Sequence, residues 1–240
     1  MTLYKFRECC ELHLSSLYNR ELYFSSPAQL NDPFDSRLPV YVGASKEEIR
    51  RYLEFVGTDI TEENISAMRA ELKDGYMDVQ SNEALLSRFG ICSFSMLRDS
   101  LTMWSMYSNG HRGYCIEYDN DLLLRDVESF KNDSKLGILW GDVNYVSYLP
   151  KIQVGSVEII KLFLSKSHQY EYEKEFRIVL AGKNNFVVTY TKEVVKSVIL
   201  GLEVSEFYEH TLRNIVKEKY PGARLLKARK SKDEIGLTFN

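Results

Sequence analysis

Short apolar segments bounded by turn residues recur along this chain, mainly toward its two ends. They are rich in β-branched and aromatic side chains, which favour strands. These segments are residues 3–6, 21–25, 89–95, 113–118, 141–148, 176–181, 186–190, 195–200, 224–228 and 235–239. The 16 tyrosines and 12 phenylalanines suit half-buried strands better than a plain helical bundle. Strands at both ends with helices between them predict an α+β fold with a largely antiparallel sheet.

A helical, charged stretch interrupts the strands between residues 45 and 88. Ser45 followed by Glu48 forms a capping-box pattern, and Thr61 can cap a second helix to about Met77. We expect this stretch to be an insertion, a lid or a buttress, within a single domain of 240 residues. Further helices are expected after Ser81, at residues 9–18, 101–107 and 157–164, and from Ser205 to Pro221.

Composition and missing motifs exclude several classes of function. A net charge of −3 excludes a globally basic nucleic-acid coat. No run approaches the roughly 18 apolar residues of a membrane span, and the first residues do not resemble a signal peptide, so we expect a cytoplasmic protein with reduced cysteines. The chain lacks a glycine-rich phosphate loop and a nucleophile elbow. Its four histidines do not form a triad by spacing, so we expect no metal, and a metal-dependent nuclease is only a remote alternative.

Alternating glutamates mark one candidate site. Glu171, Glu173 and Glu175 would share one face of a strand, with Arg177 beside Glu175 and Lys174 on the opposite face. Like charges on one face repel by about 0.2–1 kcal/mol per neighbouring pair. The pattern indicates either a solvated face or a functional carboxylate group.

Aromatic and hydroxyl side chains form a second candidate group. Ser93 and Ser95 share a strand face, and Trp104 and Tyr107 lie one helical turn apart. Together they could wall a planar ligand ring, or the two aromatic side chains could belong to the core.

Three further segments carry polar side chains at the ends of strands. Tyr4 and Lys5 lie on the first strand, and Tyr23 and Ser25 lie on the second. The second strand leads into a segment with turn chemistry, in which we expect Asn31, Asp32 and Phe34 to have a structural role.

Basic residues gather near the end of the chain, at Arg224, Lys227, Arg229 and Lys230. They could be a solvated strand edge that discourages pairing with another sheet. Alternatively, they could hold the phosphate backbone of a nucleic acid.

Several motifs together resemble a widespread bacterial and phage family of unknown function that is often found near phage-defence genes. They are Leu3-Tyr4-Lys5-Phe6, Leu22-Tyr23-Phe24-Ser25-Ser26-Pro27, Asn31-Asp32-Pro33-Phe34-Asp35, Cys92-Ser93-Phe94-Ser95, Met103-Trp104-Ser105-Met106-Tyr107, His111-Arg112-Gly113-Tyr114-Cys115-Ile116, Tyr172-Glu173-Lys174-Glu175-Phe176-Arg177 and Val198-Ile199-Leu200-Gly201. The resemblance covers the chain except for the helical stretch.

More remotely, the chain resembles the ADP-ribosyltransferases, including toxins that modify nucleic acid. The resemblance implies that NAD is the substrate, that Glu175 and Glu173 are catalytic, and that no metal is needed. It also implies that NAD is bound by the following residues: Tyr4, Lys5, Tyr23, Ser25, Ser93, Ser95, Trp104, Tyr107 and Arg177. The family's usual first-strand histidine is replaced here by Lys5 and Arg7.

The expected function is therefore an NAD-dependent ADP-ribosyltransferase-like toxin or phage-defence effector. Its acceptor could be single-stranded RNA or DNA, since a base must be exposed before its atoms can be attacked, and a cognate antitoxin is a further expected partner. The rival hypothesis is a non-enzymatic module that binds a nucleotide or a partner protein and regulates a defence system.

Overall fold

The structure is a computed structural model that describes residues 1–36, 40–77, 86–134, 137–148, 152–153 and 159–240. Within these residues, eight strands form one mixed sheet in the order β15-β14-β13-β6-β1-β5-β11-β7. The strands are β1 (Thr2–Arg7), β5 (Phe89–Ser95), β6 (Tyr114–Asp119), β7 (Gly137–Asp142), β11 (Glu175–Ala181), β13 (Val195–Leu200), β14 (Arg224–Lys230) and β15 (Leu237–Phe239). Neighbouring strands are antiparallel except β13 and β14, which are parallel. The expected α+β class with a largely antiparallel sheet is confirmed.

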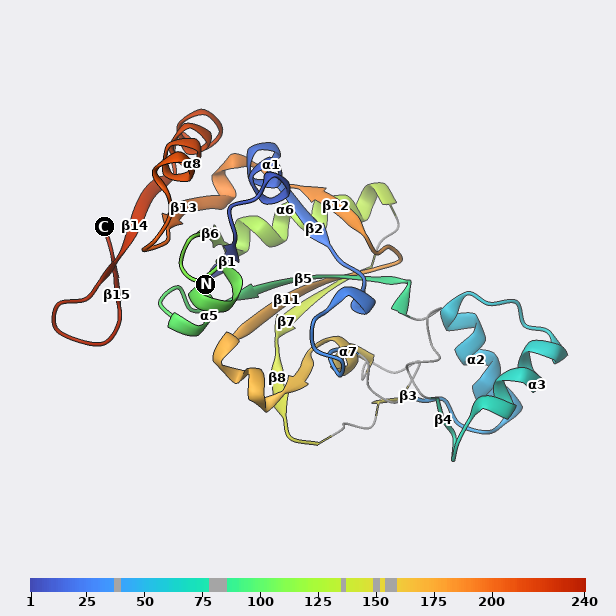
Figure 1. The fold of residues 1–240 in the computed structure, drawn as a ribbon. Coiled ribbons are helices and arrows are strands. Elements are labelled where there is room, and N and C mark those ends of the chain that lie inside the picture. Colours follow the sequence, from blue (N-terminus) through green and yellow to red (C-terminus); the bar gives the residue numbers. More distant parts are fainter. Residues whose placement is uncertain (37–39, 78–85, 135–136, 149–151, 154–158) are drawn as a thin grey trace.

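Helices cover both faces of this sheet (Figure 1). One face carries α1 (Glu11–Asn19), α6 (Asn120–Ser134) and α8 (Glu206–Lys219), whose leucines and valines pack into the largest apolar core. The other face carries α5 (Leu101–Tyr107), where Trp104 meets Phe6 of β1 in an edge-to-face contact with ring centroids 5.1 Å apart. The sheet is therefore buried on both sides near β1, as expected for the central strand of such a layer structure.

Smaller elements complete the fold. Two-stranded pairings join β2 (Glu21–Phe24) to β12 (Phe186–Thr189), and β8 (Asn144–Val146) to β10 (Ser165–Ser167). A three-stranded pairing joins β4 (Tyr76–Met77), β3 (Val40–Tyr41) and β9 (Ile152–Gln153). The short helices are η1 (Pro27–Gln29), α7 (Ile159–Phe163), η3 (His168–Glu173) and η4 (Lys192–Val194).

The helical stretch lies to one side of the large sheet (Figure 1) and contains α2 (Lys46–Val56) and α3 (Glu62–Glu71). Both predicted caps are present: Ser45 and Glu48 form the capping box, and Thr61 accepts a hydrogen bond from the Asn64 N–H. The prediction that the second helix reaches Met77 is wrong. The chain turns after α3 at Gly75, whose positive φ of 79° suits glycine, and continues into β4. The helix expected after Ser81 lies outside the described residues.

Sequence reasoning missed α6 altogether. The helix follows β6 without a loop, because the Asp119 carboxylate accepts hydrogen bonds from the Asp121 and Leu122 N–H groups. An aspartate with this bonding pattern is a common start signal for a helix, so the signal was present in the sequence.

Candidate active site

The candidate site lies where two neighbouring strands of the large sheet separate. β1 pairs with β6 over six residues, but with β5 only through Tyr4 and Ser95. Just beyond this pair, the Lys5 ammonium donates to the Ser93 carbonyl oxygen at 2.6 Å. A pocket of about 180 Å³ opens at this split, lined by side chains of β1, β5 and β11 together with Tyr107, Lys166 and Glu173.

Arg177 lies at the centre of a buried cluster of charged side chains beside this pocket. The guanidinium is fully buried and donates to both oxygens of Asp35 at 2.6 Å and to both oxygens of Glu175 at 2.8 and 2.9 Å. Its Nη1 also donates to the Phe163 carbonyl oxygen at 2.8 Å. The two-pronged geometry fixes both carboxylates, as is typical of arginine–carboxylate pairs.

Lys166 of β10 links a third carboxylate, that of Glu173, to this cluster. Its ammonium lies 2.5 Å from a Glu173 oxygen, 3.3 Å from a Glu175 oxygen and 3.6 Å from an Asp35 oxygen. The other Glu173 oxygen accepts the hydroxyl of Tyr107 at 2.5 Å. Three carboxylates and two cations therefore share a region that is almost closed to water.

This environment drives the pKa values of the two glutamates apart. Burial alone would raise the pKa of Glu175, but the charges of Arg177 and Lys166 and their hydrogen bonds lower it to about 2. Burial instead dominates at Glu173 and, despite the contact with Lys166, raises its pKa. The cluster thus combines one carboxylate whose pKa is lowered with one whose pKa is raised, a division that is common between acid–base partners.

Among the residues that the structure describes, Lys5 is a buried cation without a carboxylate partner. Its side chain contacts the Ser93 carbonyl oxygen, the Cys92 sulfur at 3.4 Å and the Phe94 ring at 4.8 Å from the centroid. Burial lowers the pKa of Lys5 to about 8. In the described part of the chain, neither Lys5 nor Arg7 forms an ion pair, so both can meet an anionic ligand.

A second, larger pocket of about 470 Å³ shares Lys5 and Arg7 with the first. Its wall is mainly apolar and aromatic, with Tyr23, Tyr114 and Tyr190 among its residues. Since the same two cations line both pockets, an anion held by them would lie between the charge cluster and the aromatic wall.

The structure brings most of the predicted catalytic and NAD-binding residues to one place. The first pocket is lined by the following predicted residues: Tyr4, Lys5, Asn31, Ser93, Ser95, Tyr107, Glu173 and Glu175. Tyr23 lies in the larger pocket instead, where its hydroxyl donates to Asn185 at 2.7 Å. Ser25 bonds the Ile91 carbonyl oxygen at the edge of β5 and lines neither pocket. Trp104 is fully buried in the core. Its position therefore agrees with the alternative of a core residue rather than with a wall of the ligand pocket.

The expectation of three alternating glutamates on one strand is wrong. Glu171 and Glu173 belong to η3, and β11 begins only at Glu175. Lys174 joins the two elements in a left-handed conformation with a φ of 43° and pairs with the exposed Glu171 at 2.8 Å. The predicted pairing of Arg177 with Glu175 is confirmed.

The segment after β2 forms the predicted turn. An Asp32 oxygen accepts the Phe34 N–H at 2.9 Å, while the Phe34 side chain is exposed. The turn also delivers Asp35 to Arg177, a contact that sequence reasoning missed together with the role of Lys166. Asp35 follows two turn residues and Lys166 lies in a polar segment. The neighbouring sequence of each residue therefore gave no indication that it belongs to the charge cluster.

The basic residues of β14 do not form one surface. Strand alternation places Lys227 and Arg229 on one face and Arg224 and Lys230 on the other. Lys227 pairs with Glu209 at 2.6 Å, and Arg229 donates to the Asn240 side chain at 2.9 Å. Arg229 and Lys230 remain exposed.

Comparison with known proteins gives one match. Residues 103–178 match the model of a family described as a protein of unknown function, DUF2971. The match supports the resemblance to a family of unknown function over the part of the chain from α5 to β11. It contains Tyr107, Lys166, Glu173, Glu175 and Arg177, and so most of the charge cluster.

No curated protein and no solved structure matches the chain. Among the described residues, every helix is too short or too polar to cross a bilayer.

Proposed function

We propose that this protein cleaves the bond between nicotinamide and ribose in NAD and transfers ADP-ribose to an acceptor. The observation that carries the proposal is the pair of glutamates with divergent pKa values, Glu173 and Glu175, at a pocket that also presents Lys5. Breaking the glycosidic bond creates positive charge on the ribose, which a fixed carboxylate stabilises.

The two glutamates take different roles in this reaction. Glu175 stays ionised and faces the positive charge that develops on the ribose. Glu173 accepts the proton of the attacking hydroxyl, amine or water as the new bond to the ribose carbon forms. Nicotinamide leaves as a neutral molecule with the electron pair of the broken bond. Tyr107 and Lys166 position the Glu173 carboxylate through their contacts at 2.5 Å.

The sizes of the two pockets suggest how NAD would bind. At about 180 Å³, the first pocket is smaller than the ~300–1,000 Å³ that encloses a drug-sized ligand, so it would take only the nicotinamide end. The pyrophosphate would meet Lys5 and Arg7, and the adenine would lie against the aromatic wall of the larger pocket.

A direct assay of NAD cleavage tests the proposal. Purified protein is incubated with NAD, and free nicotinamide is measured by chromatography, with water, single-stranded RNA, single-stranded DNA or cell protein as the acceptor. Wild-type protein should release nicotinamide, and Glu173→Gln should not. Glu171→Gln is the matched control, because Glu171 is exposed and points to Lys174 rather than the pocket.

As an NAD-consuming enzyme, the protein would act as a toxin or phage-defence effector, and a cognate antitoxin would restrain it. Induced expression of wild-type protein should then arrest growth, while Glu173→Gln should be tolerated. Growth arrest by both proteins would separate the toxicity from NAD cleavage.

The second candidate is a non-enzymatic module that binds a nucleotide. It is favoured by the completeness of the charge cluster, in which each carboxylate already contacts a cation. Buried ion-pair networks with a structural role also shift pKa values. NAD that binds with measurable affinity but stays intact with every acceptor would support this alternative.

A further inference from the structure

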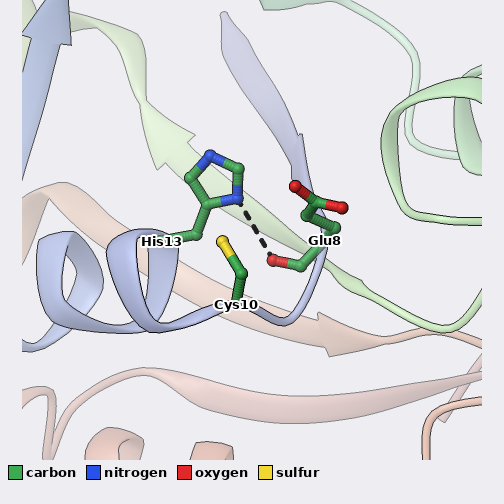
Figure 2. A group of neighbouring side chains, drawn as sticks. All are labelled: Glu8, Cys10 and His13. Carbon is green, nitrogen blue, oxygen red and sulfur yellow. Dashed lines mark hydrogen bonds between the residues drawn. The ribbon is translucent and has the colours of Figure 1, made fainter.

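The turn between β1 and α1 gathers three side chains that take no part in the proposed reaction, although His13 also lines the larger pocket. Glu8, Cys10 and His13 each offer one ligand atom, and these three atoms lie within 4.8 Å of one another (Figure 2). The spacing Glu8-x-Cys10-x-x-His13 explains the grouping. Cys10 is the residue before the first turn of α1, and His13 lies three residues later on the same side of the helix.

The geometry around the three side chains leaves them available to a ligand. Cys10 stands at the N-cap position, but its thiol makes no capping hydrogen bond. The His13 Nδ1 lies 3.3 Å from the Glu8 carbonyl oxygen, a contact that holds the ring over the turn (Figure 2). Backbone contacts of this kind commonly orient histidines that bind metal.

We propose that Glu8, Cys10 and His13 form a zinc site. Zn²⁺ accepts thiolate sulfur, imidazole nitrogen and carboxylate oxygen together, whereas Mg²⁺ and Ca²⁺ prefer oxygen alone. Three protein ligands leave the fourth tetrahedral position for water or a small ligand. Spacing among the histidines did not predict this site, because it contains only one histidine.

Charge and protonation favour the bound ion. A thiolate and a carboxylate balance the two charges of Zn²⁺, and the bound metal replaces the proton of the Cys10 thiol. Arg7 repels the cation, and the two negative ligands offset that repulsion.

The neighbouring cysteine provides a matched control. Cys9 packs against the main apolar core. It differs from Cys10 by one position but does not belong to the group of three.

Metal titration of untagged, metal-free protein tests the proposal. Zn²⁺ should bind at one equivalent by calorimetry, and Co²⁺ as a probe should give the absorption bands of a tetrahedral site with a sulfur ligand. Loss of an outer-shell partner typically weakens a metal site by about 10–100-fold. We therefore expect Cys10→Ala and His13→Ala, which each remove a direct ligand, to weaken zinc binding by more than about 100-fold.

Further variants keep the test independent of folding. Glu8 is exposed, so Glu8→Gln leaves the fold intact and should still weaken zinc binding. Cys9→Ala should bind Zn²⁺ and Co²⁺ like wild type. Wild-type protein that binds neither metal at one equivalent would overturn the proposal, as would equal binding by Cys10→Ala. The assay does not involve NAD, so its outcome is separate from that of the proposed function.

Discussion

Arg177 and Asp35 lie 142 positions apart and form a two-pronged ion pair in which both nitrogen–oxygen distances are 2.6 Å. Their side chains are 0% and 2% exposed. The pair therefore joins the turn after β2 to β11, the strand next to the edge strand β7, and fixes one wall of the candidate site.

Removing the negative charge of this pair should strongly destabilise the protein. Breaking a buried ion pair leaves an uncompensated charge and typically costs about 3–5 kcal/mol. We expect Asp35→Asn to lower the free energy of unfolding by about that amount in urea denaturation. Glu62→Gln removes an exposed ion pair with Lys46 and should change stability little. Equal stability of Asp35→Asn and wild type would show that Glu175 alone compensates the buried charge of Arg177.

The hydroxyl of Tyr107 should tune the proton affinity of Glu173. Its hydrogen bond favours the ionised carboxylate, so Tyr107→Phe should raise the pKa of Glu173 further. If Glu173 is the base, the acid limb of the pH profile of kcat/KM for NAD should move to higher pH. Tyr172→Phe changes a neighbouring tyrosine outside the pocket and should leave the profile unchanged. An acid limb that stays in place in Tyr107→Phe would exclude Glu173 as the base.

The buried Lys5 should make stability depend on pH in the alkaline range. Burial lowers its pKa from 10.5 to about 8, so the unfolded chain binds more protons than the folded one between these values. The contribution of Lys5 to the free energy of unfolding therefore rises as the pH increases from 8 to 10.5. The difference in unfolding free energy between wild type and Lys5→Met should change across this window in favour of wild type. A difference independent of pH would show that Lys5 is solvated in the folded protein.

The exposed end of β14 tests the nucleic-acid hypothesis. If Arg229 and Lys230 contact phosphates, reversing both to glutamate should weaken binding to single-stranded RNA or DNA and reduce its salt dependence. The cleavage of NAD in water should be unchanged, because neither residue lines the candidate site. Unaltered binding and modification of nucleic acid by the double variant would make a protein acceptor the better hypothesis.

Local patterns predicted most of the strands, but not the short β3, β4, β9 and β10. They also predicted several helix caps and the pairing of Glu175 with Arg177, because each depends on residues close together in sequence. The position of Glu173 was not predictable in this way, since it depends on Lys174 adopting a left-handed conformation between η3 and β11. Asp35 and Lys166 reach the cluster only through tertiary packing.

Some of the motif residues have packing roles rather than chemistry. A Cβ atom at Gly113 would lie 2.0 Å from the Arg7 carbonyl oxygen, and one at Gly201 would lie 2.2 Å from the His111 carbonyl oxygen. Both positions therefore require glycine for the close approach of β1, β6 and β13.

The release of nicotinamide from NAD is the measurement that tests the account most directly. Wild-type protein should release nicotinamide and Glu171→Gln should do so at the same rate, while Glu173→Gln should still bind NAD but leave it intact. Release at the wild-type rate by Glu173→Gln, or no release by wild type with any acceptor, would contradict the proposed enzyme.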